Sequence, residues 1–156
     1  MAVQAQRVVL ALAAALAIAV PAEGIRQYAY QDSGGVITVC WGSTTDVQAG
    51  RKYTQAECVE RLSSDMLTAM RHVERCVPGL PWHQLAAWTD AVFNLGPKIV
   101  CDPDQSTAAR LLRAGEYEAA CRQLPRWTKA RIGGVMVELP GLVKRRQREM
   151  ALCLGD

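Results

Sequence analysis

The chain has 156 residues, of which 50% are apolar and 21% are charged, a composition typical of one soluble folded domain with a sizeable core. Its formal net charge is only +3, an excess too small to indicate a nucleic-acid-binding protein. Phe occurs only once, so that Trp, Tyr, Leu and Val must supply most of the large core side chains.

The first 22 residues have the layout of an export signal. Arg7 precedes an uncharged, Ala-rich stretch, residues 8–22, which ends in a possible cleavage site. As a helix this stretch spans roughly 22 Å, against about 30 Å of hydrocarbon, so a permanent anchor is the weakest of three alternatives. Cleavage after Ala22 would deprive Glu23, a candidate catalytic residue, of the helix that fixes its position. We therefore favour an uncleaved anchor, residues 1–22, that can leave the membrane and precedes a catalytic domain, residues 23–156.

The segment after the anchor predicts a small sheet followed by a long helix. Residues 23–46 combine β-forming side chains with the turn sequence Asp32-Ser33-Gly34-Gly35, which is typical of a hairpin or a three-stranded sheet. Thr54 and Glu57 form a capping-box pattern, which should open a helix running to about Val77.

The rest of the chain predicts further helices. They are expected at residues 82–95, 106–114, 116–126 and 142–152, with a loop from Gly133 to Pro140. The order of elements predicts an α+β fold, in which a small sheet lobe near the N-terminus faces a larger helical lobe. A cleft between two such lobes suits a polymer substrate.

Basic side chains gather towards the C-terminus. They are Arg122, Arg126, Lys129, Arg131, Lys144, Arg145, Arg146 and Arg148. A positive patch there would suit a negatively charged polymer, and a solvated helix face explains the same residues equally well.

Glu23 and Asp32 are candidates for a pair of catalytic carboxyl groups. Cutting a glycosidic bond requires one carboxyl group that donates a proton to the leaving oxygen and a second that stays ionised. The two residues bracket the segment that should turn from helix into hairpin, and Thr38 lies six residues further along, where a strand could return its hydroxyl towards them. The pair alone is common in proteins and gains its meaning from the motifs around it.

Five ordered motifs surround these residues. They are Glu23-Gly24-Ile25-Arg26 with Tyr30-Gln31-Asp32 and Thr38, then Phe93-Asn94-Leu95-Gly96, Ser106-Thr107 with Leu111-Leu112, Arg126-Trp127, and Gly141-Leu142 with Arg145-Arg146 and Glu149. In order and spacing, over residues 23–152, they resemble the phage-lysozyme (endolysin) family.

The resemblance implies a lysozyme-like fold and an N-acetylmuramidase. Such an enzyme hydrolyses the β-1,4 bond between N-acetylmuramic acid and N-acetylglucosamine in peptidoglycan, for host cell lysis. The resemblance implies Glu23 as general acid, Asp32 as second carboxylate and Thr38 as a holder of the attacking water, with no metal or organic cofactor. We also expect a monomer.

Two other functions remain open. A lytic transglycosylase acts on the same bond with one acid and no nucleophilic water, so the presence of both Asp32 and Thr38 argues against it. A non-catalytic wall-binding protein of lysozyme fold would have no need of Glu23 and Asp32.

The Ala-rich segment directly before Glu23 resembles the anchors of signal-anchor-release endolysins. This resemblance implies export by the host secretion machinery and an inactive form held in the inner membrane by residues 8–22. The active periplasmic form would arise when the freed segment leaves the membrane and packs on the enzyme.

The six cysteines are scattered, with no CxxC pair and no histidine at the short spacing of a zinc site. Their even number favours disulfides in an oxidising compartment, although six cysteines allow 15 pairings. Grouping by region gives Cys40 with Cys58, Cys76 with Cys101, and Cys121 with Cys153. A Cys58–Cys76 link would contradict that grouping.

Overall fold

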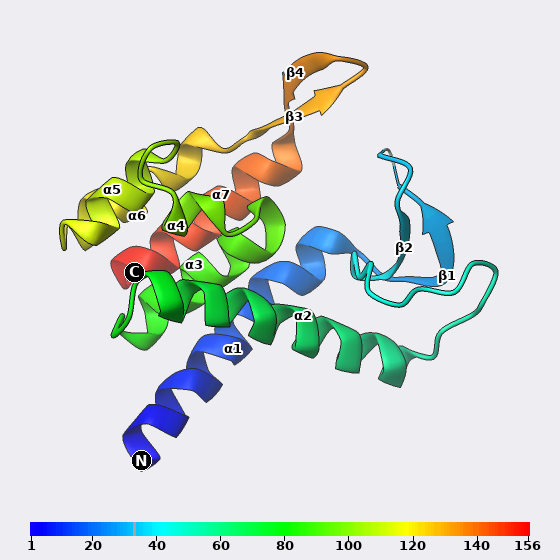
Figure 1. Ribbon diagram of the computed structural model, residues 1–156, viewed down its shortest axis with the longest axis horizontal. Coiled ribbons are helices and arrows are strands. Elements are labelled where there is room, and N and C mark those ends of the chain that lie inside the picture. The colour runs from blue at the N-terminus through cyan, green and yellow to red at the C-terminus, as the bar shows by residue number, and fades with distance from the viewer. Residues whose placement is uncertain (33) are drawn as a thin grey trace.

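The structure is a computed structural model and describes residues 1–32 and 34–156. Its elements are α1 (Ala2–Glu23), β1 (Arg26–Gln31), β2 (Ile37–Cys40), α2 (Gln55–Cys76), α3 (Trp82–Leu95), α4 (Lys98–Cys101), α5 (Thr107–Arg113), α6 (Tyr117–Cys121), the 3₁₀ helix η1 (Leu124–Arg126), β3 (Lys129–Ile132), β4 (Val135–Glu138) and α7 (Pro140–Leu154). The β1–β2 hairpin stands at one side of a larger helical body, as the α+β expectation requires (Figure 1).

The small lobe is built on an antiparallel hairpin. Tyr30 pairs with Thr38 and Gln31 with Ile37, while the register shifts towards the other end of the two strands. Of the two arrangements predicted, the structure has the two-stranded one, because the returning chain contributes only an isolated bridge between Lys52 and Tyr28.

Helix α2 begins where the capping box predicts. The Glu57 amide donates to Thr54 Oγ1 at 3.1 Å, and the Thr54 amide donates to Glu57 Oε2 at 2.7 Å. These bonds satisfy two amide donors that a helix start otherwise leaves unpaired. The apolar face of α2 is buried, as its periodicity predicts; its members are Leu62, Met66, Ala69, Met70 and Val73.

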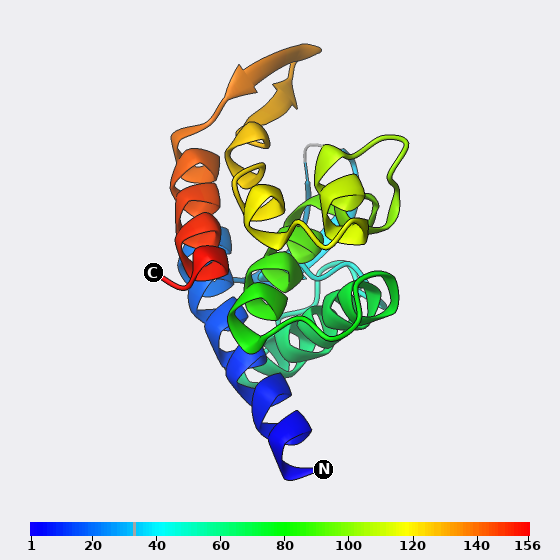
Figure 2. The same ribbon diagram turned by 90° about the vertical axis from the view of Figure 1, so that its left-hand side faces the viewer.

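Helix α3 forms the centre of the helical lobe. It begins and ends at the predicted residues, and the side chains from Gln84 to Val92 are buried, including the fully buried Trp88. Helices α1, α2 and α7 surround it (Figure 2).

Helix α1 is docked on the body along most of its length. Ala11, Ala15 and Ala19 are fully buried, and these small side chains let the helix approach its neighbours closely. Near the N-terminus, Arg7 donates to the Leu80 carbonyl at 2.5 Å and lies 2.5 Å from the Glu74 carboxylate. In the part of the chain that the structure describes, only α1 is long and apolar enough to cross a membrane.

The segment predicted as a loop, Gly133 to Pro140, is mostly strand. Lys129–Ile132 and Val135–Glu138 pair as an antiparallel hairpin, and α7 begins earlier than predicted, at Pro140. Gly133 and Gly134, with φ of +56° and +83°, make a two-residue turn of the kind that joins hairpin strands. The loop prediction was wrong: the glycine pair makes a hairpin turn between two short, exposed strands, which have no buried face to reveal them in the sequence.

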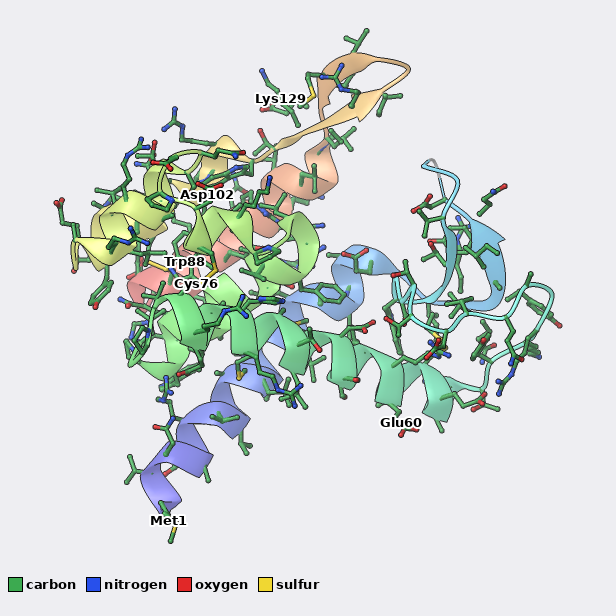
Figure 3. All side chains as sticks on the ribbon, viewed as in Figure 1. Met1, Glu60, Cys76, Trp88, Asp102 and Lys129 are labelled. Atoms are coloured by element: carbon green, nitrogen blue, oxygen red, sulfur yellow. A yellow bond between two sulfur atoms is a disulfide. The ribbon has the colours of Figure 1, made fainter. Side chains whose placement is uncertain are left out.

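Three disulfides join the cysteines in the regional pairs. Cys40–Cys58 ties the hairpin to α2, Cys76–Cys101 ties the end of α2 to α4, and Cys121–Cys153 ties α6 to α7. Figure 3 labels Cys76 near Trp88, in the helical lobe.

Candidate active site

Glu23 is the last residue of α1 and faces the junction between the lobes. The helix ends there because Gly24 has φ +65°, a conformation that continues neither the helix nor an ordinary strand. One carboxylate oxygen of Glu23 accepts a hydrogen bond from Arg145 Nη1 of α7. The Glu23 side chain remains 25% exposed, so the carboxyl group is held by the protein and also open to a ligand.

A hollow of about 200 Å³ lies beside this carboxyl group. Glu23, Trp41, Gly42, Phe93 and Asn94 line it, from α1, the chain after β2, and α3. A Cβ atom added at Gly42 would lie 3.8 Å from Glu23 Oε2, so the glycine keeps the space next to the acid clear.

This hollow continues as a groove along α2. A second hollow of about 230 Å³ shares Gly42 and Phe93 with the first and extends over Asp65, Thr68 and His72. A third, of about 270 Å³, shares Asp65 and Thr68 with the second. Together the three adjoining hollows have both polar and apolar lining residues, which suits a chain of sugars better than a compact ligand. Burial raises the pKa of Asp65, and a hydrogen bond with Ser43 and the charge of Arg61 oppose the rise.

Asp32 lies in the turn between β1 and β2. Its Oδ1 accepts hydrogen bonds from the amides of Gly34 and Val36, both at 2.8 Å, which fixes the position of the side chain. The hollow beside Glu23 has no lining residue from this turn. In the part of the chain that the structure describes, no hydrogen bond or ion pair joins Asp32 to Glu23.

Thr38 lies on β2, opposite Tyr30 of β1. Its side chain is only 4% exposed, and its hydroxyl donates to the Val36 carbonyl at 3.1 Å. The hairpin thus brings Thr38 close to the turn that carries Asp32. Figure 1 shows the hairpin of β1 and β2 at one side of the molecule, joined to the C-terminal end of α1.

Behind Glu23 lies a buried cluster of charges from α3 and α7. Arg145 Nε donates to Asp90 Oδ2 at 2.9 Å and Arg145 Nη2 donates to Asp90 Oδ1 at 2.8 Å, a two-bond pair between buried side chains. Burial lowers the pKa of Arg145, but the hydrogen bonds and charges of Asp90 and then Glu23 outweigh it and raise the pKa above its usual value.

Arg146 and Glu149 complete the cluster. Arg146 Nη2 donates to Asn94 Oδ1 at 2.6 Å, and Arg146 Nε lies 3.1 Å from Glu149 Oε2. Burial, followed by the neighbouring Asp90, raises the pKa of Glu149 well above its usual value, while Arg146 and Arg145 oppose the rise. Arg145 and Arg146 therefore belong neither to an exposed positive patch nor to a solvated helix face, the two alternatives left open by the sequence.

Residues 21–149 match the sequence profile of the family described as phage lysozyme. This chain belongs to the phage lysozyme family. It is 37% identical over 145 residues to a SAR-endolysin of Pseudomonas phage phiKMV, an alignment that covers 92% of this chain and 88% of the relative.

Solved structures confirm the lysozyme-like fold. The active form of the P1 phage endolysin Lyz superposes with a TM-score of 0.78 at 27% identity, over 91% of this chain and 83% of that one. The muramidase domain of SpmX from Asticaccaulis excentricus gives a TM-score of 0.78 at 26% identity, over 92% and 94%. The fold class predicted from the sequence is thereby confirmed.

The contact between Asp90 and Arg145 in this phage lysozyme was not predicted from the sequence. The two residues are 55 positions apart, and no periodic pattern links them. One signal was present: Asp90 is a charged residue within the long apolar run of the 82–95 helix, and such a residue, when buried, needs a cationic partner.

Proposed function

We propose that this phage lysozyme is an endolysin that hydrolyses the β-1,4 bond between N-acetylmuramic acid and N-acetylglucosamine in peptidoglycan. The observation that carries the proposal is the Glu23 carboxyl group, fixed by α1 and Arg145 at the head of a groove made of three adjoining hollows. A partly exposed acid at such a point can reach the oxygen of a bound glycosidic link.

The chemistry divides between the two lobes. Glu23, from the helical side, donates its proton to the leaving oxygen. Asp32, from the hairpin turn, is the second carboxylate and stabilises the positive charge that develops on the sugar, with its position fixed by two amide hydrogen bonds. Thr38 helps to hold the attacking water, which requires its hydroxyl to turn from the Val36 carbonyl towards the substrate.

The decisive test uses purified peptidoglycan. Glu23→Gln keeps the shape of the side chain and removes the proton donor, so hydrolysis should fall at least about 10²-fold while the unfolding temperature stays close to that of the native enzyme. Undiminished hydrolysis by the variant would contradict the catalytic role. Glu60→Gln on the exposed side of α2 serves as the control and should retain full activity.

Mass spectrometry of the products separates the hydrolase from a transglycosylase. Hydrolysis adds water and leaves reducing ends, whereas a transglycosylase leaves 1,6-anhydro sugars. Reducing ends are the expected outcome, because Asp32 and Thr38 supply the groups that a water-dependent reaction needs.

Helix α1 serves as an uncleaved signal anchor in this proposal. Export by the host secretion machinery first leaves residues 8–22 in the inner membrane, and the active periplasmic monomer forms when α1 docks on the body. The length and apolar character of α1 support the membrane form, and its buried alanine face supports the docked form. The functional boundary then falls between residues 1–22 and 23–156, although α1 packs as part of one body.

N-terminal sequencing of the periplasmic enzyme tests the anchor. Full-length protein should appear first in the membrane fraction and, after an uncoupler, in the soluble periplasmic fraction. A mature form that begins at Glu23 would instead show ordinary signal cleavage and contradict the proposed anchor.

A further inference from the structure

We propose that Asp90 is a positioning residue for glycosidic cleavage, which acts through Arg145 to hold the Glu23 carboxyl group in place and to let it keep the proton that it donates. This inference rests on the proposed function, because it assigns to Asp90 a part in the work of Glu23. Asp90 itself touches neither the groove nor the substrate.

The first argument is the sharing of one guanidinium group. Arg145 uses Nε and Nη2 for Asp90, at 2.9 and 2.8 Å, and Nη1 for Glu23. A paired contact of this kind fixes the plane of the guanidinium group as well as its position. The orientation of the bond to Glu23 is therefore set from behind, by Asp90.

The second argument concerns charge. A cation in contact with a carboxyl group favours its ionised form, whereas a general acid must hold a proton at the working pH. The charged side chains of the described residues that face Arg145 come from three helices: Glu23 from α1, Asp90 from α3, and Arg146 and Glu149 from α7. Among these, Asp90 alone binds Arg145 through two hydrogen bonds, so it is the anion best placed to offset the positive charge that Glu23 contacts.

The third argument is burial. The Asp90 side chain is fully buried and that of Arg145 is 3% exposed, so water screens their interaction little. Asp90 follows Trp88, labelled in Figure 3, by two residues in the most deeply buried stretch of α3. Asp90 and Arg145 both lie on helices other than α1, so the pair that orients the guanidinium group does not include the helix that carries Glu23.

The test is the pH dependence of peptidoglycan hydrolysis by Asp90→Asn. This variant keeps the size of the side chain and removes its charge, so Arg145 acts on Glu23 without an offset. The pH at which activity falls by half on the alkaline side should decrease by about one unit or more. Above that pH the variant should be about tenfold slower for each unit of decrease.

A matched control is Thr89→Val, the neighbouring residue of α3. Thr89 is fully buried, and its hydroxyl has no hydrogen-bond partner in the part of the chain that the structure describes. The substitution is of similar size and removes no charge, so the alkaline midpoint should remain that of the native enzyme. An Asp90→Asn variant with the native midpoint would overturn the inference, whatever its absolute rate.

Two further variants keep the test decisive if Asp90→Asn does not fold. The double variant D90N/R145Q removes both charges of the pair. If Asp90 offsets Arg145, removal of both charges should leave the alkaline midpoint close to that of the native enzyme, whereas a midpoint about one unit or more above it would mean that Arg145 acts without an offset and would overturn the inference. Arg145→Gln removes the cation and leaves the Asp90 charge, so its midpoint should lie above that of the double variant. Active Glu23→Gln enzyme would refute the proposed function itself, whereas Glu23-dependent activity with an unmoved midpoint in Asp90→Asn would refute only the role of Asp90.

Discussion

Glu23 owes its surroundings to residues from distant parts of the chain. It ends α1, it bonds to Arg145 of α7, and it faces Gly42 after β2. Gly42 has φ +82°, which a glycine adopts without strain, and it brings no side chain into the hollow next to the acid. The sequence therefore provides both the carboxyl group, at Glu23, and the free space beside it, at Gly42.

Replacement of Gly42 by Ala tests the value of that space. The added methyl group occupies part of the hollow and lies against Glu23, so activity per folded molecule should fall by at least about tenfold. The positive φ also costs roughly 1–3 kcal/mol of stability. Gly50→Ala is the matched control, since Gly50 has φ +76° and no heavy atom within 4 Å of an added Cβ. Denaturant unfolding should show a similar loss of stability in both variants. Peptidoglycan hydrolysis should fall in Gly42→Ala alone, and equal activities of the two variants would contradict the prediction.

Residue-level features differ in how far the sequence reveals them. Glu23, Asp32 and Thr38 follow from short motifs whose spacing the chain preserves, and their roles stay predictions until variants are measured. The Asp90–Arg145 pair depends on how α3 packs against α7, and neither residue lies near the other in sequence. Local pattern cannot supply that information, because it is created only when the helices assemble.

At the scale of elements, α1 combines two surfaces. Its buried face contains Ala11, Ala15 and Ala19, whereas Val9 and Leu10 on the other side are 64% and 41% exposed. Small side chains permit close docking and also keep the helix only moderately apolar, which is the property expected of an anchor that must leave lipid. The same alanine-rich composition therefore suits α1 both in the membrane and docked on the enzyme.

Ala15→Leu should disturb docking without weakening the anchor. Ala15 is fully buried in the core under the small lobe, so the larger side chain overpacks it at a cost of about 1–3 kcal/mol. Ala13→Leu adds the same side chain on the exposed face and is the control. Released Ala15→Leu enzyme should show a lower unfolding temperature and weaker hydrolysis than released Ala13→Leu enzyme. Identical behaviour of the two would argue that the alanine face does not mediate docking.

The predicted elements agree best with the structure where caps and periodicity act together. Helix α2 has both a capping box and an apolar face, and α3 ends at Gly96, so their bounds were predicted closely. The hairpin of β3 and β4 was missed because its strands are short and exposed, which leaves no buried face to set a pattern of alternation. The four-residue α4 is too short for periodicity to reveal.

Across the whole molecule, three disulfides restrain the body and none includes α1. They link the hairpin to α2, α2 to α4, and α6 to α7. All three disulfides can therefore form before α1 has docked on the rest of the protein.

Removal of the Cys40–Cys58 bridge tests how much the small lobe depends on it. The bridge closes a chain separation of 18 residues, which corresponds to about 3 kcal/mol of stability. The double variant Cys40→Ala with Cys58→Ala should unfold at lower denaturant concentration, and reduction should destabilise it less than it destabilises the native enzyme. Denaturant unfolding with and without reductant checks both, and an equal response to reduction would contradict the assignment.

The continuity of α1 with the body through Gly24 has a kinetic consequence. The helix that brings Glu23 is tethered to its own docking site, so the two meet at an effective concentration on the order of millimolar. Assembly of the acid site is therefore a first-order event within each molecule. Its rate per molecule does not depend on how many copies the cell contains, and a small population of the enzyme becomes active as quickly as a large one.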